Sequence, residues 1–324
     1  MRILVVGKKQ SMHWPENVAK FLPAEHNCCL FLYNALTLHS VVDKVLKRHR
    51  WKNRAQLFKR KVLEFKPDII FFVSAFFVPQ EFYDVAASFK NIIKVGWTGD
   101  AFGLGVAEKA NVLDILFCSD TGFLPIAKNF LCATQYLPLC ADETVFCNLD
   151  LPHTKAPFFV GDSNPVRVEY LSALQTHFEI YGIHWPKHKL KQHSVHNRRL
   201  EYDRVNKFYN TSIAPINLNF SRNGINGLNF RVFEIGATGR LIIVNEQEDL
   251  KLCYEIDKEC VVYHTPEELD ALLQDIAQDP LKYQSIAKNG FLRTLKEHTY
   301  TKRLEQALVE IEQLVQKRGN FLES

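Results

Sequence analysis

Apolar residues in the first third of the chain form short runs separated by amphipathic segments. Mostly apolar runs, each typical of a buried strand, lie at 3–6, 28–33, 69–73, 92–97 and 113–118, and a shorter one lies at 136–138. Between them, apolar residues recur at helical spacing in 18–22, 41–65 and 82–89, with a break expected at 51–53. Strands that alternate with helices predict a parallel sheet covered on both faces.

The same alternation restarts after a proline-containing linker at 151–157. The pattern predicts strands at 158–161, 178–181, 211–217, 241–244 and 260–263, and helices at 166–176, 202–209 and 230–238. Gly239 follows the last of these helices as a C-cap. Thr265 and Pro266 mark the start of another helix, and helical segments are expected to continue to about residue 318.

This pattern predicts two Rossmann-like, doubly wound parallel-sheet domains, an N-terminal one over 1–150 and a C-terminal one over 151–298. Residues 299–324 are expected to form a C-terminal helix, with packing back on the N-terminal domain as one option. Ligands of open parallel sheets bind at the carboxyl ends of the strands. Two such domains that face one another therefore predict a central cleft.

Composition sets limits on the class of protein. A chain of 324 residues suits two domains. The eight cysteines include no C-x-x-C pair, which argues against a zinc or redox motif. The chain opens directly on an apolar strand, and no apolar run reaches the roughly 18–20 residues that span a bilayer. We expect reduced thiols and a cytoplasmic protein.

The net charge of +4 is small, but basic residues are concentrated in one stretch. That stretch contains Lys44, Lys47, Arg48, Arg50, Lys52, Arg54, Lys59, Arg60 and Lys61. Such a cluster is either the solvated face of a helix or an attractor for phosphate, nucleic acid or a membrane surface. Nucleic-acid binding and peripheral membrane contact through 44–61 both remain open.

The segment 220–234 carries the clearest chemistry. Gly224 and Gly227 allow the backbone to approach a ligand closely, and the following helix begins near Asn229. A helix N-terminus behind a glycine-containing loop favours an anion. Arg231 and Glu234 share a face of this helix: a guanidinium suits a diphosphate, and a carboxylate suits ribose hydroxyls. The alternative is an ordinary surface ion pair.

The run Asn229-Phe230-Arg231-Val232-Phe233-Glu234-Ile235-Gly236-Ala237-Thr238-Gly239 resembles the motif of the CgeB-like glycosyltransferases, a group of GT-B enzymes. The similarity continues in 241–244, 259–263, 266–269, 286–290 and 297–303. It covers the second half of the chain closely and the first half loosely. It implies a GT-B fold and transfer of a sugar from a nucleotide-diphosphate sugar, without a bound metal or other cofactor.

The resemblance also implies roles for particular residues. Glu234 would bind the donor ribose, and Arg231 would lie near the donor phosphates. The Gly161 loop matches the first loop of the C-terminal domain, with Arg167 as a second phosphate-binding residue. The remaining donor-site candidates are Gly227 and Asn229.

Two further positions bear on donor recognition. His184 and Trp185 end the strand where such folds hold the nucleobase, so either could stack on it; for Trp185 the alternative is core packing. The familiar GT-B motif has two glutamates, and neutral residues within 226–229 replace the first one. The stereochemistry of transfer is therefore left open, as is the choice between a UDP-linked and a GDP-linked donor.

The N-terminal half is expected to hold the acceptor and the catalytic base. Asp100 lies between glycines at the carboxyl end of a strand, which is a suitable place for a general base, although a loop aspartate also serves as a turn former. His13, after the first strand, is the second candidate base.

The favoured function is therefore transfer of a sugar to a hydroxyl of a saccharide, lipid-linked or surface-polymer acceptor. One alternative is a DNA-modifying glycosyltransferase of phage type, which the basic residues in 44–61 and 187–199 suggest. The other is a non-catalytic nucleotide-sugar-binding protein.

Overall fold

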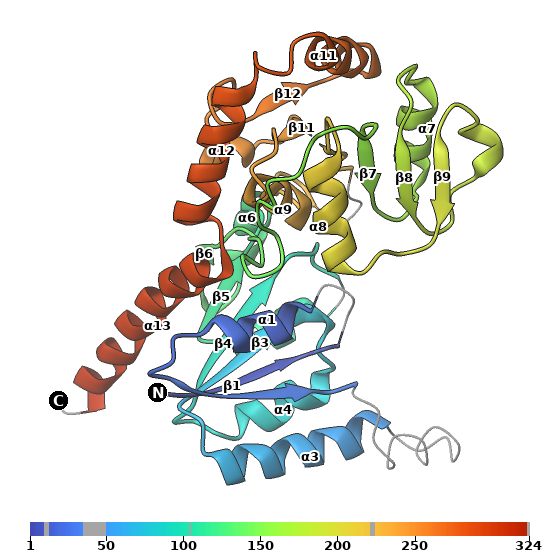
Figure 1. The fold of residues 1–324 in the computed structure, drawn as a ribbon. Coiled ribbons are helices and arrows are strands. Elements are labelled where there is room, and N and C mark those ends of the chain that lie inside the picture. The colour runs from blue at the N-terminus through green and yellow to red at the C-terminus, as the bar shows by residue number, and fades with distance from the viewer. Residues whose placement is uncertain (10–12, 35–49, 104, 221–223, 323–324) are drawn as a thin grey trace. The chain divides into compact units, whose positions relative to one another are not determined.

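The computed structural model describes residues 1–9, 13–34, 50–103, 105–220 and 224–322. The chain divides into two compact units (Figure 1). Unit 1 consists of Met1–Pro138, Asn223–Ile225 and Tyr300–Ser324, and unit 2 consists of Leu139–Arg222 and Asn226–Thr299.

The units divide after Pro138 rather than at the predicted 150/151 linker. Hydrogen bonds explain why the segment 139–150 groups with unit 2. The Leu149 amide donates to Asn210 Oδ1 (2.8 Å) and the Cys147 amide to Asn206 Oδ1 (3.3 Å). The Asn210 side-chain amide in turn donates to the Cys147 carbonyl (3.0 Å). Two asparagines of one helix therefore hold this stretch to unit 2.

Unit 1 contains a sheet in which every paired strand is parallel, as the sequence predicts. The strands are β1 (Arg2–Gly7), β2 (Asn27–Leu32), β3 (Ile69–Val73), β4 (Ile93–Thr98), β5 (Ile115–Cys118) and β6 (Ala133–Tyr136). Their order across the sheet is β2-β1-β3-β4-β5-β6. All residues of β3 are buried, which is typical of a strand covered on both faces.

Helices pack on this sheet through aromatic side chains. They are α1 (Trp14–Phe21), α3 (Arg50–Phe65), α4 (Gln80–Ala87), α5 (Val106–Ala110), α6 (Leu124–Ala127) and α13 (Tyr300–Leu322), with 3-10 turns η1 (Ala75–Phe77) and η2 (Thr121–Phe123). Phe72 of β3 stacks on Tyr83 of α4 with ring centroids 4.5 Å apart. Helix α3 is continuous from Arg50, so the predicted break at 51–53 is wrong; residues 41–49 of that prediction lie outside the described residues.

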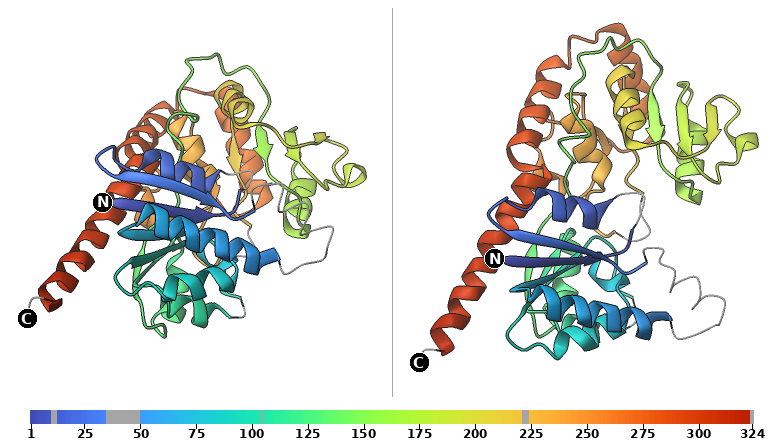
Figure 2. Two further views of the ribbon diagram at one scale, coloured as in Figure 1. Left: turned by 90° about the horizontal axis from the view of Figure 1, so that it is seen from below. Right: turned by 60° about the horizontal axis from the view of Figure 1, so that its bottom comes forward.

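The last helix, α13, groups with unit 1. It runs beside α1 (Figure 2), where Phe21 stacks on Tyr300 with ring centroids 5.5 Å apart. The chain therefore returns to the domain in which it began.

Unit 2 contains β7 (Phe158–Val160), β8 (Glu179–Gly182), β9 (Ser194–Asn197), β10 (Ile216–Asn217), β11 (Ile243–Asn245) and β12 (Val261–Tyr263). They pair in two parallel groups, β7-β8-β9 and β10-β11-β12. Parallel bridges from Phe158 to Pro215 and from Lys155 to Ser212 join the groups at β7 and β10. The resulting order, β9-β8-β7-β10-β11-β12, is the Rossmann arrangement.

The helices of unit 2 begin and end largely where the sequence predicts. They are α7 (Pro165–Ala173), α8 (Tyr202–Thr211), α9 (Phe230–Ala237), α10 (Leu250–Cys253), α11 (Pro266–Gln278) and α12 (Gln284–Glu297), with a 3-10 turn η3 (Lys187–Lys189). Thr265 caps α11 by accepting from the Glu268 amide. Gly239 follows α9 with φ 75°, the left-handed conformation expected of a C-cap glycine.

All eight cysteines are free thiols. Within the described part of the chain, no helix combines the length and the apolar character that a membrane span needs.

Candidate functional site: an arginine pair at the switch point of unit 2

The order of strands in unit 2 places a ligand site by topology. The chain runs from β7 outward to β8 and β9, then returns to the other side of β7 with β10. The direction of winding therefore changes between β7 and β10. Ligands of open α/β sheets bind in the crevice at the carboxyl ends of the strands at this switch point. Two loops lie there: the Gly161 loop after β7 and the segment after β10 that leads to α9.

Arg167 belongs to the first turn of α7, which follows the Gly161 loop. Asn164 caps that helix by accepting from the Arg167 amide at 2.8 Å. The Arg167 guanidinium donates through Nη1 to the Asp162 carbonyl (2.9 Å) and through Nη2 to the Leu218 carbonyl (3.2 Å). Arg167 therefore connects the loop after β7 to the strand end of β10.

The half-buried Arg167 guanidinium has no carboxylate bonded to it in the described part of the chain, and its buried Nε has no hydrogen-bond partner there. Burial, together with the positive charge of Arg231, lowers the pKa of Arg167 to about 9. A buried cation that lacks a counter-ion is costly. The arrangement therefore favours an anion.

Arg231 lies at the start of α9 and reaches the Gly161 loop. A Cβ atom on Gly161 would be 3.2 Å from Nη2 of Arg231 and 3.1 Å from Cζ of Phe159. Glycine at position 161 therefore leaves the room that the Arg231 guanidinium occupies. The Gly161 amide itself donates to the Tyr181 carbonyl (2.8 Å), so Gly161 contributes space rather than a free N–H group.

Glu234 lies one helical turn after Arg231, and it is buried. Burial is the largest influence on its carboxyl group and, with the Asp142 charge, raises its pKa to about 7, whereas Arg231 and the Tyr209 hydroxyl act in the opposite direction. The contact with Tyr209 lies outside strict hydrogen-bond geometry. A carboxyl group in this state has acceptor oxygens available for the hydroxyls of a sugar.

Asn229 and Gly227 have structural roles that the sequence did not predict. Asn229 Oδ1 caps α9 through the Arg231 amide (3.0 Å), and its side-chain amide donates to Asn219 Oδ1 (2.6 Å). Asn219 donates in turn to the Gly227 carbonyl (2.8 Å), and its own amide donates to Asn245 Oδ1 (2.6 Å). This asparagine network fixes the loop before α9, so the Asn229 side chain is used in hydrogen bonds within the protein.

Trp185 lies in the core of unit 2. Its side chain is 2% exposed, its indole N–H donates to the Gly161 carbonyl (2.9 Å), and its ring packs edge-on against Phe159. The predicted stacking of Trp185 on a nucleobase is therefore not compatible with this structure, because neither face of the ring is open. The indole instead holds the Gly161 loop.

His184, its neighbour, is exposed at the carboxyl end of β8. Its φ of 64° is unusual for a residue other than glycine, and its carbonyl accepts from Ser163 Oγ at 2.7 Å. Strained backbone of this kind is concentrated at functional sites. Of the two aromatic candidates, His184 is the one with an accessible ring.

The two candidate bases of unit 1 lie at the carboxyl edge of its sheet. Asp100 follows β4 and is half-buried; its carbonyl accepts from Thr98 Oγ1 (3.3 Å). His13 precedes α1 with φ 47°, and its Nδ1 is 3.8 Å from Glu16 Oε1. A Cβ on Gly99 would be 3.1 Å from the Trp14 ring. Gly99, the neighbour of Asp100, therefore lies close to Trp14, the neighbour of His13.

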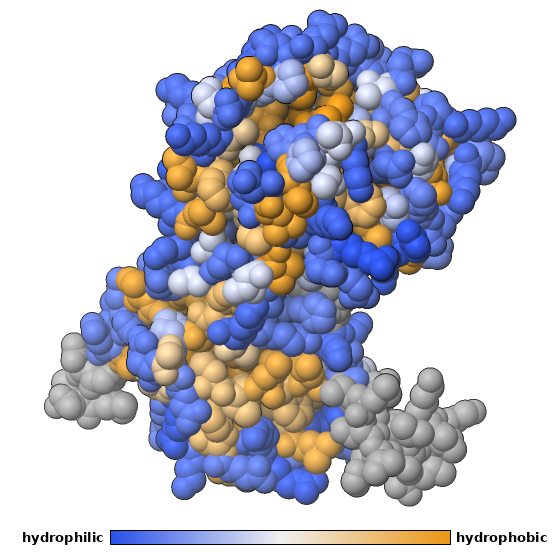
Figure 3. Space-filling model, in the orientation of Figure 1, coloured by the Kyte–Doolittle hydropathy of each residue, from blue (hydrophilic) through white to orange (hydrophobic). Residues whose placement is uncertain are grey.

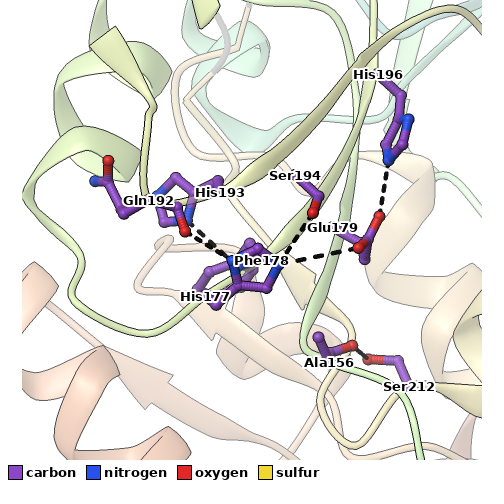
Figure 4. Close-up of polar contacts among 9 residues, drawn as sticks. All are labelled: Ala156, His177, Phe178, Glu179, Gln192, His193, Ser194, His196 and Ser212. Carbon is purple, nitrogen blue, oxygen red and sulfur yellow. Dashed lines mark hydrogen bonds and ion pairs between the residues drawn. The ribbon is translucent and has the colours of Figure 1, made fainter.

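A second polar cluster lies on the β8–β9 edge of unit 2 (Figure 4). His196 Nε2 is 2.9 Å from Glu179 Oε2, and Ser194 Oγ is 3.1 Å from His177 Nε2. Glu179 Oε1 also approaches Nε2 of His177, at 3.9 Å. Because Ser194 and Glu179 approach the same ring nitrogen, the cluster lacks the relay geometry of a catalytic triad.

Across the described ranges of the chain, no three side chains of His, Cys, Asp or Glu converge as a metal site would require.

The fold of the chain is that of the GT-B glycosyltransferases, as the sequence predicts. Sucrose-phosphate synthase from Thermosynechococcus elongatus is similar with a TM-score of 0.70 and 11% identity, over 98% of this chain and 100% of that one. HepE from Anabaena, solved with UDP and glucose, has a TM-score of 0.68 and 10% identity over 97% and 100%. A glycosyltransferase from Rickettsia africae has a TM-score of 0.69 and 15% identity, over 97% of this chain and 98% of that one.

The sequence agrees with the structural comparison. Residues 167–309 match the family described as glycosyl transferase-like. This match covers Arg167, Arg231 and Glu234. None of the curated proteins matches the chain. The narrower CgeB-like assignment stays a prediction, and neither alternative function gains support from these comparisons.

Proposed function

We propose that this protein is a glycosyltransferase that moves a sugar from a nucleotide-diphosphate sugar to a hydroxyl group of a saccharide, lipid-linked or surface-polymer acceptor. One observation carries the proposal. Arg167 and Arg231 converge on the Gly161 loop at the switch point of unit 2, and neither side chain bonds a carboxylate in the described residues. A diphosphate supplies the negative charge and the acceptor oxygens that this pair lacks.

The rest of the donor would lie along the same strand ends. Glu234, one turn below Arg231, accepts from the ribose hydroxyls, and His184 contacts the nucleobase. HepE, one of the similar structures, was solved with UDP and with UDP-glucose. A uridine diphosphate sugar is therefore the first donor to test.

The chemistry follows from where charge develops. As the bond between the sugar carbon and the phosphate oxygen breaks, negative charge builds on the leaving diphosphate, and the two guanidinium groups stabilise it. Asp100 removes the proton of the acceptor hydroxyl, with His13 as the second candidate. Since the arginines provide the positive charge, we expect activity that withstands a chelator, and the proposal involves no cofactor beyond the donor.

Thermal denaturation with a panel of nucleotides tests donor binding. UDP, GDP and UDP-glucose form the panel, with UMP as the control that lacks the second phosphate. A ligand that binds only the folded protein raises the melting temperature. We expect a shift with at least one diphosphate and a smaller one with UMP. Absence of a shift with every diphosphate would contradict the proposal.

Release of nucleotide separates an enzyme from a binding protein. We expect slow hydrolysis of the bound donor by the wild-type protein without acceptor, and none by Glu234→Ala. A wild-type protein that binds the donor but never releases nucleotide, with or without acceptor, would point to a non-catalytic binding protein instead.

A further inference from the structure

Strand β2 forms one edge of the unit 1 sheet and is apolar along most of its length. After Asn27 its sequence is Cys-Cys-Leu-Phe-Leu, and each of these residues is only half-buried. Figure 3 shows apolar residues gathered on the surface around β2 in the lower part of the view. Edge strands usually carry charges or prolines that discourage contacts. An apolar edge strand without charges or prolines therefore indicates an interaction surface.

Helix α3 lies against the same strand. Phe58 of α3 packs on Phe31 with ring centroids 5.6 Å apart, and Trp51 packs on Tyr33 at 5.7 Å. The helix contains six basic residues and one acidic residue. Its outward face presents Lys52, Lys59 and Arg60 together with Leu63, which is 55% exposed. Helix α3, which contacts β2, therefore presents basic side chains on its exposed face.

The three outward bases are not neutralised within the described part of the chain. Lys52, Lys59 and Arg60 form no ion pair there, although Glu64 lies on the same helix. The nearest helix, α4, offers Asp84, which accepts instead from Gln80 at 3.0 Å. The charge of the outward face of α3 is thus available to an external anion.

We propose that α3 and the β2 edge form a docking surface for an anionic lipid bilayer. A bilayer supplies both complements at once: its headgroups carry negative charge for the bases, and its interface accepts apolar side chains such as Leu63. A second copy of the chain paired at β2 would bring two strongly basic helices together. Nucleic acid offers phosphates but no partner for the apolar edge.

Vesicle co-sedimentation of the full chain tests this surface. The protein is mixed with phosphatidylcholine vesicles, with and without phosphatidylserine, and with a duplex oligonucleotide as competitor. The main variant is K52E/K59E/R60E, and the matched control is K187E/K189E/R204E, which reverses three exposed bases of unit 2. A milder variant, Leu63→Gln, removes only the exposed apolar side chain. Circular dichroism and melting temperature establish that each variant is folded.

We expect binding to the phosphatidylserine vesicles only, weakened by salt. The partition coefficient of the main variant onto these vesicles should be lower on the order of 100-fold, because each basic residue contributes a similar amount to the free energy of membrane binding. The control should bind as the wild type, and Leu63→Gln should bind several-fold less. The proposal would be overturned if the protein bound neutral vesicles equally well, or if the main variant kept its binding to the phosphatidylserine vesicles. It would also be overturned if the duplex displaced the protein from the vesicles, or if the protein dimerised and thereby lost its binding to them. None of these outcomes depends on donor binding.

Discussion

The switch point of unit 2 and the carboxyl edge of the unit 1 sheet differ in the polar groups that they bring together. In unit 2, Arg167 donates to two carbonyls from different loops, and a chain of asparagines fixes the segment that carries Arg231. In unit 1, the candidate bases His13 and Asp100 follow β1 and β4, two strands that β3 separates, and Gly99 lies close to Trp14.

The difference is compatible with the ligands that we propose for each side. A diphosphate is the same in every nucleotide sugar, so a rigid pair of guanidinium groups suits it. An acceptor hydroxyl has to be deprotonated at one point only, so one carboxylate near the strand end is sufficient. Substitutions in unit 2 should therefore alter binding of the donor, and those in unit 1 should alter turnover.

The largest effect is expected at Asp100. Asp100→Asn removes the proposed base, so kcat/KM should fall about 10²- to 10⁴-fold, while UDP binding stays at the wild-type level. His13→Gln is the matched variant at the same edge and should lower the rate less. Steady-state kinetics with titration of UDP measures both. If His13→Gln lowers the rate more than Asp100→Asn, the base is His13.

The next largest effect is the pH dependence caused by Glu234. Its pKa is raised from 4.5 to about 7, so the folded state keeps a proton that the unfolded state releases between those values. Wild-type stability should therefore fall as pH rises from about 4.5 to 7, by roughly 2–3 kcal/mol. Glu234→Gln cannot titrate and should lack this fall. Chemical denaturation of both proteins across this range measures the difference.

Binding should change in the opposite direction. If the ribose hydroxyls donate to the ionised carboxylate, UDP affinity of the wild type rises as pH increases through about 7, because more of Glu234 is charged. Glu234→Gln should show weaker affinity that does not change over this range. If the UDP affinity of the wild type does not change with pH, Glu234 does not bind the ribose through its ionised carboxylate.

A smaller effect is expected at Gly161. A Cβ at this position would lie 3.2 Å from the Arg231 guanidinium and 3.1 Å from Phe159, so Gly161→Ala should displace Arg231 and weaken UDP binding about 10-fold. Gly103→Ala is the control, because a Cβ there meets nothing within 4 Å. Calorimetric titration compares the two. Equal affinities would mean that the Arg231 position is not set by Gly161.

The smallest effect concerns the backbone at His184. Its φ of 64° is strained for histidine, so His184→Gly should raise the free energy of unfolding by up to about 1 kcal/mol. His188→Gly, at an exposed position in η3, should lower it instead. Denaturant midpoints distinguish the two. A loss of stability in His184→Gly equal to that in His188→Gly would show that the conformation carries no strain.

Much of the fold could be predicted because its signals are local. The apolar run that forms β3 needs no partner to be recognised, and Thr265 caps α11 through a bond to an amide a few residues away. Strand β9 was missed, because its sequence Ser-Val-His-Asn has one apolar residue and no alternation. It forms through pairing with β8, a contact that the pattern along the chain does not encode.

The candidate site divides in the same way. Arg231 and Glu234 stand one turn apart in a single helix, so their shared face follows from spacing. Asn219 and Asn245 lie at the ends of different strands and act through contacts between them, so no periodicity indicates their role. For Trp185 the sequence left nucleobase stacking and core packing open, because an aromatic residue after a strand suits both, and only burial separates the two.

Calorimetric titration of UDP into the wild type, Arg167→Ala and Arg231→Ala tests the central claim most directly. Arg204→Ala, which removes an exposed arginine of α8, is the matched control. Charge-assisted bonds to phosphate should be worth enough that each of the first two variants binds about 10- to 100-fold more weakly, while Arg204→Ala binds like the wild type. Unchanged UDP affinity in folded Arg167→Ala and Arg231→Ala would contradict the account.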